Sequence, residues 1–212
     1  MAKVKTATRT LSNAGRLRTL VIATSHKADG VLVAESLVEY DGLLELLADP
    51  DIASLRVQPE TLEFKMDGRA VSYTPDVRFV RQDGRIGFRE FKPPVATLDD
   101  EVMAKLGVAQ EVLTKQGYEF DVRDSDSVRQ GHRIENLRLL KRYAVWPTSQ
   151  AFQRPVLDFV GGYDDVCLQD LRDLVGPHGY GALYRMLWER QLQADLEERA
   201  LGALTRIWRA CL

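Results

Sequence analysis

The feature that most constrains this chain is the stretch 72–94, where two apolar runs carry charged residues at their outer ends. Asp76 opens the first run, and Glu90 and Lys92 close the second. Gly84 follows an aspartate between the runs, and an Asp-Gly dipeptide in this place is typical of a β-hairpin turn. We therefore expect two paired strands that bring the three charged side chains to one end of the hairpin.

The turn decides whether the two acids share a face of the hairpin. Glu90 and Lys92 point the same way, because side chains alternate with a period of two along a strand. A two-residue turn would place Asp76 opposite Phe91 and so separate it from Glu90 by a face. A three-residue turn, with Gly84 in the left-handed conformation of a bulge, places Asp76 opposite Glu90. We expect the three-residue turn, because the acids meet only with it or with another one-residue irregularity.

Such a site suits a hard cation. Mg²⁺ is usually held by one or two carboxylates, with phosphate and water completing the octahedron. Asp76 and Glu90 would supply the carboxylates, and the carbonyl of Phe91 a further oxygen. Lys92 would orient the attacking water or neutralise a phosphate. The spacing is typical of the metal-dependent nucleases written PD-(D/E)xK, in which Mn²⁺ substitutes for Mg²⁺. Alternating charges on a strand also suit an ordinary solvated face.

A third acid is expected from the first helix, residues 35–48. Glu39 is the candidate for both a metal-binding and a catalytic role. Ser36 gives a second interpretation, a capping box in which Glu39 bonds back to the N–H of Ser36. Glu45 is the other candidate, and it faces a different direction because it lies about one and two-thirds turns beyond Glu39.

Composition places the chain among globular proteins with a sizeable core. Of its 212 residues, 45% are hydrophobic and 28% are charged, and the formal net charge is −2. The two cysteines and three histidines are scattered, so the pattern predicts neither a zinc site nor a disulfide framework. No apolar run reaches the length of a membrane span, and the N-terminal residues lack the apolar region of a signal peptide. We therefore expect a cytoplasmic protein with no membrane partner.

Positive charge is concentrated in residues 1–30, which we expect to form a basic N-terminal arm. Only one acid, Asp29, lies in this segment, against Lys3, Lys5, Arg9, Arg16, Arg18 and Lys27. Such an arm suits the binding of nucleic-acid phosphates. A solvated terminus has the same composition.

Periodicity and turn residues predict an α/β domain over residues 31–147, with a mixed sheet flanked by helices. Its expected strands are 52–58, 61–65, 70–73, 76–81, 85–92 and 118–123, and its expected helices are 35–48, 98–116 and 130–144. Trp146-Pro147 and the polar residues that follow mark a domain boundary. We expect residues 148–212 to form a small, mainly helical domain, with helices at 164–175, 179–188 and 195–209 and a short wing at 192–196.

Aliphatic residues of the last segment can form a compact helical core. They are Leu168, Leu171, Leu174, Val175, Leu183, Leu187, Leu192 and Leu196. The aromatic residues of the segment exceed what so small a core easily hides; they are Tyr180, Tyr184, Trp188 and Trp208. They either pack against the rest of the chain or form a protein-binding patch, since aromatic residues are favoured at interfaces.

Four pieces of the sequence, in this order, resemble the TnsA endonucleases, the subunits of heteromeric bacterial transposases that cut the 5′ ends of the element. They are Ser36-x-x-Glu39, Leu55-Arg56-Val57-Gln58-Pro59, Tyr73-Thr74-Pro75-Asp76 and Glu90-Phe91-Lys92-Pro93. The resemblance covers about residues 31–146. It implies a restriction-endonuclease-like fold and Mg²⁺ held by Glu39, Asp76 and Glu90, with Lys92 as the catalytic lysine.

The resemblance also implies a function and partners. The chain would cut double-stranded DNA at transposon ends during cut-and-paste transposition, in the bacterial cytoplasm at the nucleoid. A DDE-type transposase subunit would join the 3′ ends, and an AAA+ ATPase would regulate the complex. The family's C-terminal half is winged-helix-like and contacts that regulator, so residues 148–212 are expected to dock a protein partner. Two alternatives remain: a restriction, phage or repair nuclease of the same fold, and a non-catalytic interaction subunit.

Overall fold

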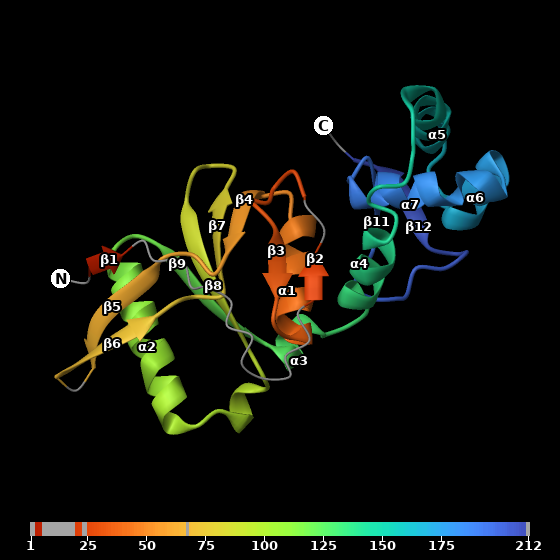
Figure 1. Ribbon diagram of the computed structural model, residues 1–212. Coiled ribbons are helices and arrows are strands. Elements are labelled where there is room, and N and C mark those ends of the chain that lie inside the picture. The colour runs from red at the N-terminus through yellow and green to blue at the C-terminus, as the bar shows by residue number, and fades with distance from the viewer. Residues whose placement is uncertain (1–2, 6–19, 23–24, 67, 211–212) are drawn as a thin grey trace. The chain divides into compact units, whose positions relative to one another are not determined.

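The computed structural model describes residues 3–5, 20–22, 25–66 and 68–210 (Figure 1). The chain divides into two compact units, Met1–Val128 and Arg129–Leu212. This division lies before the boundary expected at residue 147. The reason is that the helix Arg133–Lys141, expected in the first domain, packs against Tyr180–Trp188 and buries Leu140 in the core of the second unit.

The described residues of the first unit form nine strands: β1 Lys3–Lys5, β2 Leu20–Ile22, β3 Leu32–Ala34, β4 Ile52–Val57, β5 Thr61–Met66, β6 Arg69–Tyr73, β7 Val77–Arg81, β8 Ile86–Lys92 and β9 Glu119–Asp124. The main sheet has the order β4-β7-β8-β9. Its first three strands are antiparallel, and β9 runs parallel to β8. The expected α/β class with a mixed sheet is therefore confirmed.

The helices of the first unit are α1 Leu37–Ala48, α2 Asp100–Lys115 and the short α3 Ser125–Val128, with a 3₁₀ turn at Val95–Thr97. Helices α1 and α2 cover opposite faces of β8 (Figure 1). On one face, a Cβ at Gly42 of α1 would lie 1.9 Å from the ring of Phe91, so this glycine lets α1 approach the strand. On the other face, Phe88 packs with Leu106 and Leu113 of α2. Alternate residues of β8 therefore face α1 and α2, and residues two apart face the same helix.

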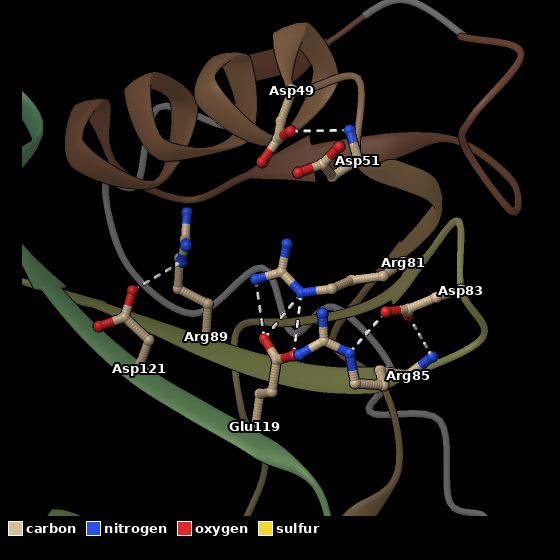
Figure 2. A network of polar contacts seen from close by, with 8 residues as sticks. All are labelled: Asp49, Asp51, Arg81, Asp83, Arg85, Arg89, Glu119 and Asp121. Atoms are coloured by element: carbon tan, nitrogen blue, oxygen red, sulfur yellow. Dashed lines mark hydrogen bonds and ion pairs between the residues drawn. The ribbon is translucent and has the colours of Figure 1, made fainter.

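A network of ion pairs ties the strands together at the turn end of the β7–β8 hairpin (Figure 2). Glu119 of β9 accepts from the Nε of Arg81 at 2.9 Å and from Arg85 at 2.9 Å. Arg85 also pairs with Asp83 in the turn at 2.7 Å. Bidentate bonds between arginine and carboxylate fix geometry as well as charge, so the network anchors this turn to the neighbouring parallel strand.

Two described pieces of the basic arm belong to sheets, and the third, residues 25–30, contains Lys27. β1 pairs with β5 and β2 pairs with β3, both antiparallel. The Lys27 ammonium group donates hydrogen bonds to the carbonyls of Leu47 and Asp49 at the end of α1. Arg9, Arg16 and Arg18 lie outside the described residues, so phosphate binding by the arm stays a prediction.

The second unit contains α4 Arg133–Lys141, α5 Gln150–Gly162, β10 Val166–Cys167, α6 Leu168–Val175, α7 Tyr180–Trp188, β11 Leu192–Ala194 and β12 Arg206–Arg209, with a 3₁₀ turn at Pro177–Gly179. Its strands form an antiparallel sheet with the order β10-β12-β11. Among the described residues of the whole chain, no helix is long and apolar enough to cross a bilayer.

Two expectations for the second unit were wrong. The helix expected at 195–209 does not form; instead β12 pairs with both other strands, and Ile207 is buried between exposed neighbours, as in a half-buried strand. Helix α5 was not expected at all, because Ser149 was taken as part of the polar run that marks the domain boundary. Ser149 is in fact the N-cap of α5 and accepts the backbone N–H of Phe152. The interior Pro155 also hid the helix from its sequence pattern.

The core of the second unit accounts for two of the four aromatic residues noted in the sequence. Tyr184 is buried and stacks on Tyr143, and Trp188 packs at the edge of the same core. Residues from α4 and the segment after it enlarge this core beyond the expected size. Leu174, expected in the core, is 46% exposed, and Trp208 is 44% exposed.

Candidate active site

The hairpin turn has the three-residue form that the two acids require. The Arg81 N–H donates to the Arg85 carbonyl at 2.8 Å, and the Gly84 N–H donates back to the Arg81 carbonyl at 3.0 Å. Gly84 has a φ of 86°, the left-handed region that a bulged turn needs. Val77 therefore pairs with Arg89, which brings Asp76 level with Glu90 as expected.

Asp76 and Glu90 are locked together by the backbone of the hairpin. The Asp76 N–H donates to Glu90 Oε2 at 3.2 Å, and the Phe91 N–H donates to Asp76 Oδ2 at 2.7 Å. Asp76 is half-buried, whereas Glu90 is only 4% exposed. Asp76 Oδ1 receives no hydrogen bond from the described residues, so it is free to bind a ligand.

Glu90 is held from two further sides. Lys92 donates to Glu90 Oε1 at 2.5 Å, and the hydroxyl of Tyr73 donates to Glu90 Oε2 at 2.8 Å. Tyr73 is buried at the end of β6. Tyr73 was not expected to be a site residue, although it lies three positions before Asp76 in the motif Tyr-Thr-Pro-Asp.

Burial and mutual electrostatic interactions raise the pKa values of the titratable groups in the cluster. Burial and the nearby charge of Glu90 raise the pKa of Asp76 from 3.8 to about 8, and Glu39 adds to the rise. Burial works against the charged form of Lys92, but Glu90 and Asp76 together raise the pKa of this lysine. Burial and the charge of Glu90 also raise the pKa of Tyr73, which therefore keeps its proton and acts as a donor. The cluster is an acidic pair with one close cation, so a divalent cation would relieve its repulsion.

Glu39 lies near Asp76, because both residues line a small pocket of about 50 Å³ together with Glu35. Its carboxylate accepts the Glu35 N–H at 2.8 Å and the hydroxyl of Ser36 at 3.0 Å. Ser36 in turn accepts the Glu39 N–H as the N-cap of α1. The capping role is therefore found in part, because the Glu39 carboxylate bonds back to the N–H of Glu35 and not to the expected N–H of Ser36. Its place beside Asp76 keeps the metal-binding interpretation open.

Glu45 belongs to another part of the molecule. It pairs with Arg123 at 3.2 Å and with Arg89 at 3.9 Å. Arg89 precedes Glu90 on β8 and so points to the opposite face, toward α1, where it also pairs with Asp121 (Figure 2). The structure therefore separates Glu45 from Asp76 and Glu90.

Gln58 is a second residue that the sequence analysis did not single out for the site. Its φ of 43° is left-handed, a conformation that is uncommon outside glycine. Its N–H donates to the Asp76 carbonyl at 2.8 Å, and its side-chain amide donates to Glu35 at 2.7 Å. This strained residue fixes the backbone of Asp76 against β4, and strain of this kind often occurs at functional sites.

A cleft of about 630 Å³ opens beside the cluster. The residues that line it include Asp76, Glu90 and Lys92, together with Lys105 of α2, which the sequence analysis also missed. The sequence could have indicated Lys105, because this lysine lies at helical spacing among the apolar residues of the α2 face that packs on the sheet. A lysine on such a face needs an explanation.

The donor set suits Mg²⁺. Within the described ranges, no three aspartate, glutamate, histidine or cysteine side chains are placed to hold a metal together. Mg²⁺ does not require three, because it is commonly bound by one or two carboxylates with water and phosphate. Asp76 and Glu90 provide the pair, and the Phe91 carbonyl is the expected extra oxygen. Oδ1 of Asp76 accepts no hydrogen bond from the residues that the structure describes.

Comparison with known protein families gives no match to this sequence. No curated protein matches it significantly either. The site and the residues that form it are therefore the basis for assigning a function.

Proposed function

We propose that this protein is a metal-dependent endonuclease that cuts double-stranded DNA. The observation that carries the proposal is the register of the β7–β8 hairpin, which puts Asp76 opposite Glu90 with Lys92 on the same face. Two acids and a lysine in this arrangement are the groups that phosphodiester hydrolysis requires around Mg²⁺ or Mn²⁺. The mixed sheet with a helix on each face supports a restriction-endonuclease-like fold.

The roles of the residues follow from their contacts. Bound Mg²⁺ would supply the activated water and stabilise charge on the phosphate. Asp76 and Glu90 would hold the ion, and Glu39 would add negative charge from the neighbouring pocket. The Lys92 ammonium group donates one hydrogen bond to Glu90 and has further N–H groups that can donate to a phosphate oxygen beside it. Tyr73 keeps Glu90 in place through its hydroxyl.

Within this class, we propose a TnsA-like role in cutting the 5′ ends of a transposon. The motif order in residues 31–146 supports it, and so does the order of elements in the second unit. There α5, β10, α6, α7, β11 and β12 follow one another with the sheet order β10-β12-β11, as a winged-helix domain requires. The proposed partners are a DDE-type transposase subunit and an AAA+ ATPase, in the bacterial cytoplasm at the nucleoid.

Burial in α7 favours a protein partner for the second unit. In a helix-turn-helix arrangement α7 would be the helix that reads the major groove. Most of its residues, from Gly181 to Leu187, are buried, and Arg185 is engaged by Glu189 at 2.7 Å. Helix α7 therefore offers little free surface to DNA. Exposed Trp208 on β12 is a better candidate for a contact with protein.

The test is cleavage of a supercoiled plasmid and of a transposon-end duplex by the full chain, with Mg²⁺ or Mn²⁺ and with the partner transposase present. We expect cleavage by the wild-type protein and none by Asp76→Asn or Lys92→Ala. Asp83→Asn, in the turn at the other end of the same hairpin, is the matched control and should cut normally. Cleavage by the Asp76 variant at the wild-type rate would overturn the proposal.

A further inference from the structure

We propose that Lys105 of α2, with the hydroxyl pair of Thr61 and Thr74, forms a second phosphate subsite in the cleft beside Asp76 and Glu90. Its ligand would be a backbone phosphate next to the one that is cut. The inference rests on the proposed nuclease function and adds to it a place for the DNA strand. All three side chains line the same cleft of about 630 Å³ as the two acids.

Lys105 is placed for this role by its surroundings. Its neighbours Val102 and Leu106 line the same cleft, and Leu106 is buried in the core. The Lys105 ammonium group lies 5.7 Å from the centre of the Tyr73 ring, and the hydroxyl of that ring bonds to Glu90. One aromatic ring therefore separates this lysine from the metal-binding acid.

Within the described part of the chain, no acid is paired with Lys105. Among the described residues, the structure gives it a contact with an aromatic ring and no carboxylate partner within ion-pair distance. Lys92 differs, because it already donates to Glu90. A half-buried lysine without a counter-ion, at the wall of a polar cleft, suits an anionic ligand.

The threonine pair supplies a neutral donor in the same cleft. The hydroxyl oxygens of Thr61 and Thr74 lie 2.8 Å apart, and one of them donates to the other. The accepting hydroxyl keeps its own hydrogen free for a ligand oxygen. Thr74 lies two residues before Asp76, so the donor is fixed relative to the site of cleavage. A lysine and a hydroxyl bind phosphate oxygens without reading a base, so the subsite would position DNA of any sequence.

The experiment measures DNA binding as a function of salt, with a fluorescent duplex, no metal and the full chain. Affinity for DNA falls as salt rises, and loss of one phosphate contact makes the plot of log affinity against log salt less steep by about 0.9. We expect this loss for Lys105→Gln, with a several-fold higher Kd, and recovery in Lys105→Arg. Lys115→Gln is the matched control, because Lys115 lies on the same helix, is exposed and pairs with Glu111. It should keep the wild-type slope.

Three outcomes separate the possibilities. An unchanged slope and Kd in Lys105→Gln would overturn the subsite, and the nuclease proposal would stand if Asp76→Asn still abolished cleavage. An unchanged slope with a lowered Tm would show that Lys105 only supports the Tyr73 ring, which also overturns the subsite. A wild-type chain that neither cut nor bound DNA would overturn the proposed function, and the subsite with it.

Discussion

Asp76 and Glu90 lie opposite each other on neighbouring strands, and each carboxylate accepts an N–H from the other's strand. The Asp76 N–H reaches Glu90 at 3.2 Å, and the N–H of Phe91 reaches Asp76 at 2.7 Å. This reciprocal arrangement exists because a three-residue turn at Gly84 sets the register. A one-residue slip would move one acid to the other face of the sheet.

The first prediction concerns that turn. Gly84→Ala should destabilise the protein by about 1–2 kcal/mol, because the left-handed backbone conformation is unfavourable for alanine. No steric clash adds to this cost, since a Cβ at this position would meet no atom within 4 Å. Gly107→Ala in α2, also with open space around it, is the control and should be neutral or stabilising by about 0.5–1 kcal/mol. Chemical denaturation measures both. Equal effects would mean that the turn does not depend on its glycine.

The second prediction concerns Tyr73. Tyr73→Phe removes the hydroxyl that holds Glu90 and leaves the ring in the core. Groups that orient a metal ligand typically contribute 10–100-fold to metal affinity or activity, so we expect a loss of that size in Mn²⁺ affinity with little change in Tm. Wild-type affinity in this variant would show that the hydrogen bond does not position Glu90.

The third prediction separates the two interpretations of Glu39. Glu39→Gln keeps an oxygen acceptor for the Glu35 N–H, so the stability of α1 should barely change. We expect weaker metal binding and lower activity, because the variant removes a charge beside Asp76. Ser36→Ala is the complementary control: it should cost about 1 kcal/mol of stability and leave metal affinity intact. Normal metal affinity in Glu39→Gln would restrict the residue to capping.

The fourth prediction is a dependence of stability on pH. The pKa of Asp76 is raised in the folded, metal-free protein to about 8, above its ordinary 3.8. The folded state therefore holds more protons than the unfolded state between these values, and this group makes stability fall as pH rises from about 4 to 8. Thermal melts should show the decline for the wild type and a weaker one for Asp76→Asn. Mg²⁺ should restore stability most strongly near pH 8, and an identical profile in the variant would contradict the assignment.

The sequence predicted the site well where local rules decide the structure. The Asp-Gly turn, the period of two along β8 and the helix cap at Ser36 each depend on a few neighbouring residues, and all three are found as expected. Tyr73, Gln58 and Lys105 were missed as site residues because their roles arise from contacts between segments far apart in the chain. Of these three, Lys105 could have been recognised from the sequence pattern, because it is a lysine on an otherwise apolar helix face.

The second unit shows the limits more plainly. Residues 206–209 form a strand because β10 and β11 flank them on both sides, and that pairing is not visible in the local pattern. Helix α4 was given to the wrong domain for a similar reason. Its apolar face fits either core by sequence, and only the packing of Leu140 with residues such as Leu183 decides.

The central claim is that Asp76 and Glu90 hold a divalent metal, and titration calorimetry of the full chain with Mn²⁺ tests it most directly. We predict binding by the wild-type protein and by Asp83→Asn, and a loss of at least about 100-fold in affinity for Asp76→Asn and for Glu90→Gln, in line with the loss of a metal-binding carboxylate. Equal Mn²⁺ affinity in all four proteins would contradict the claim.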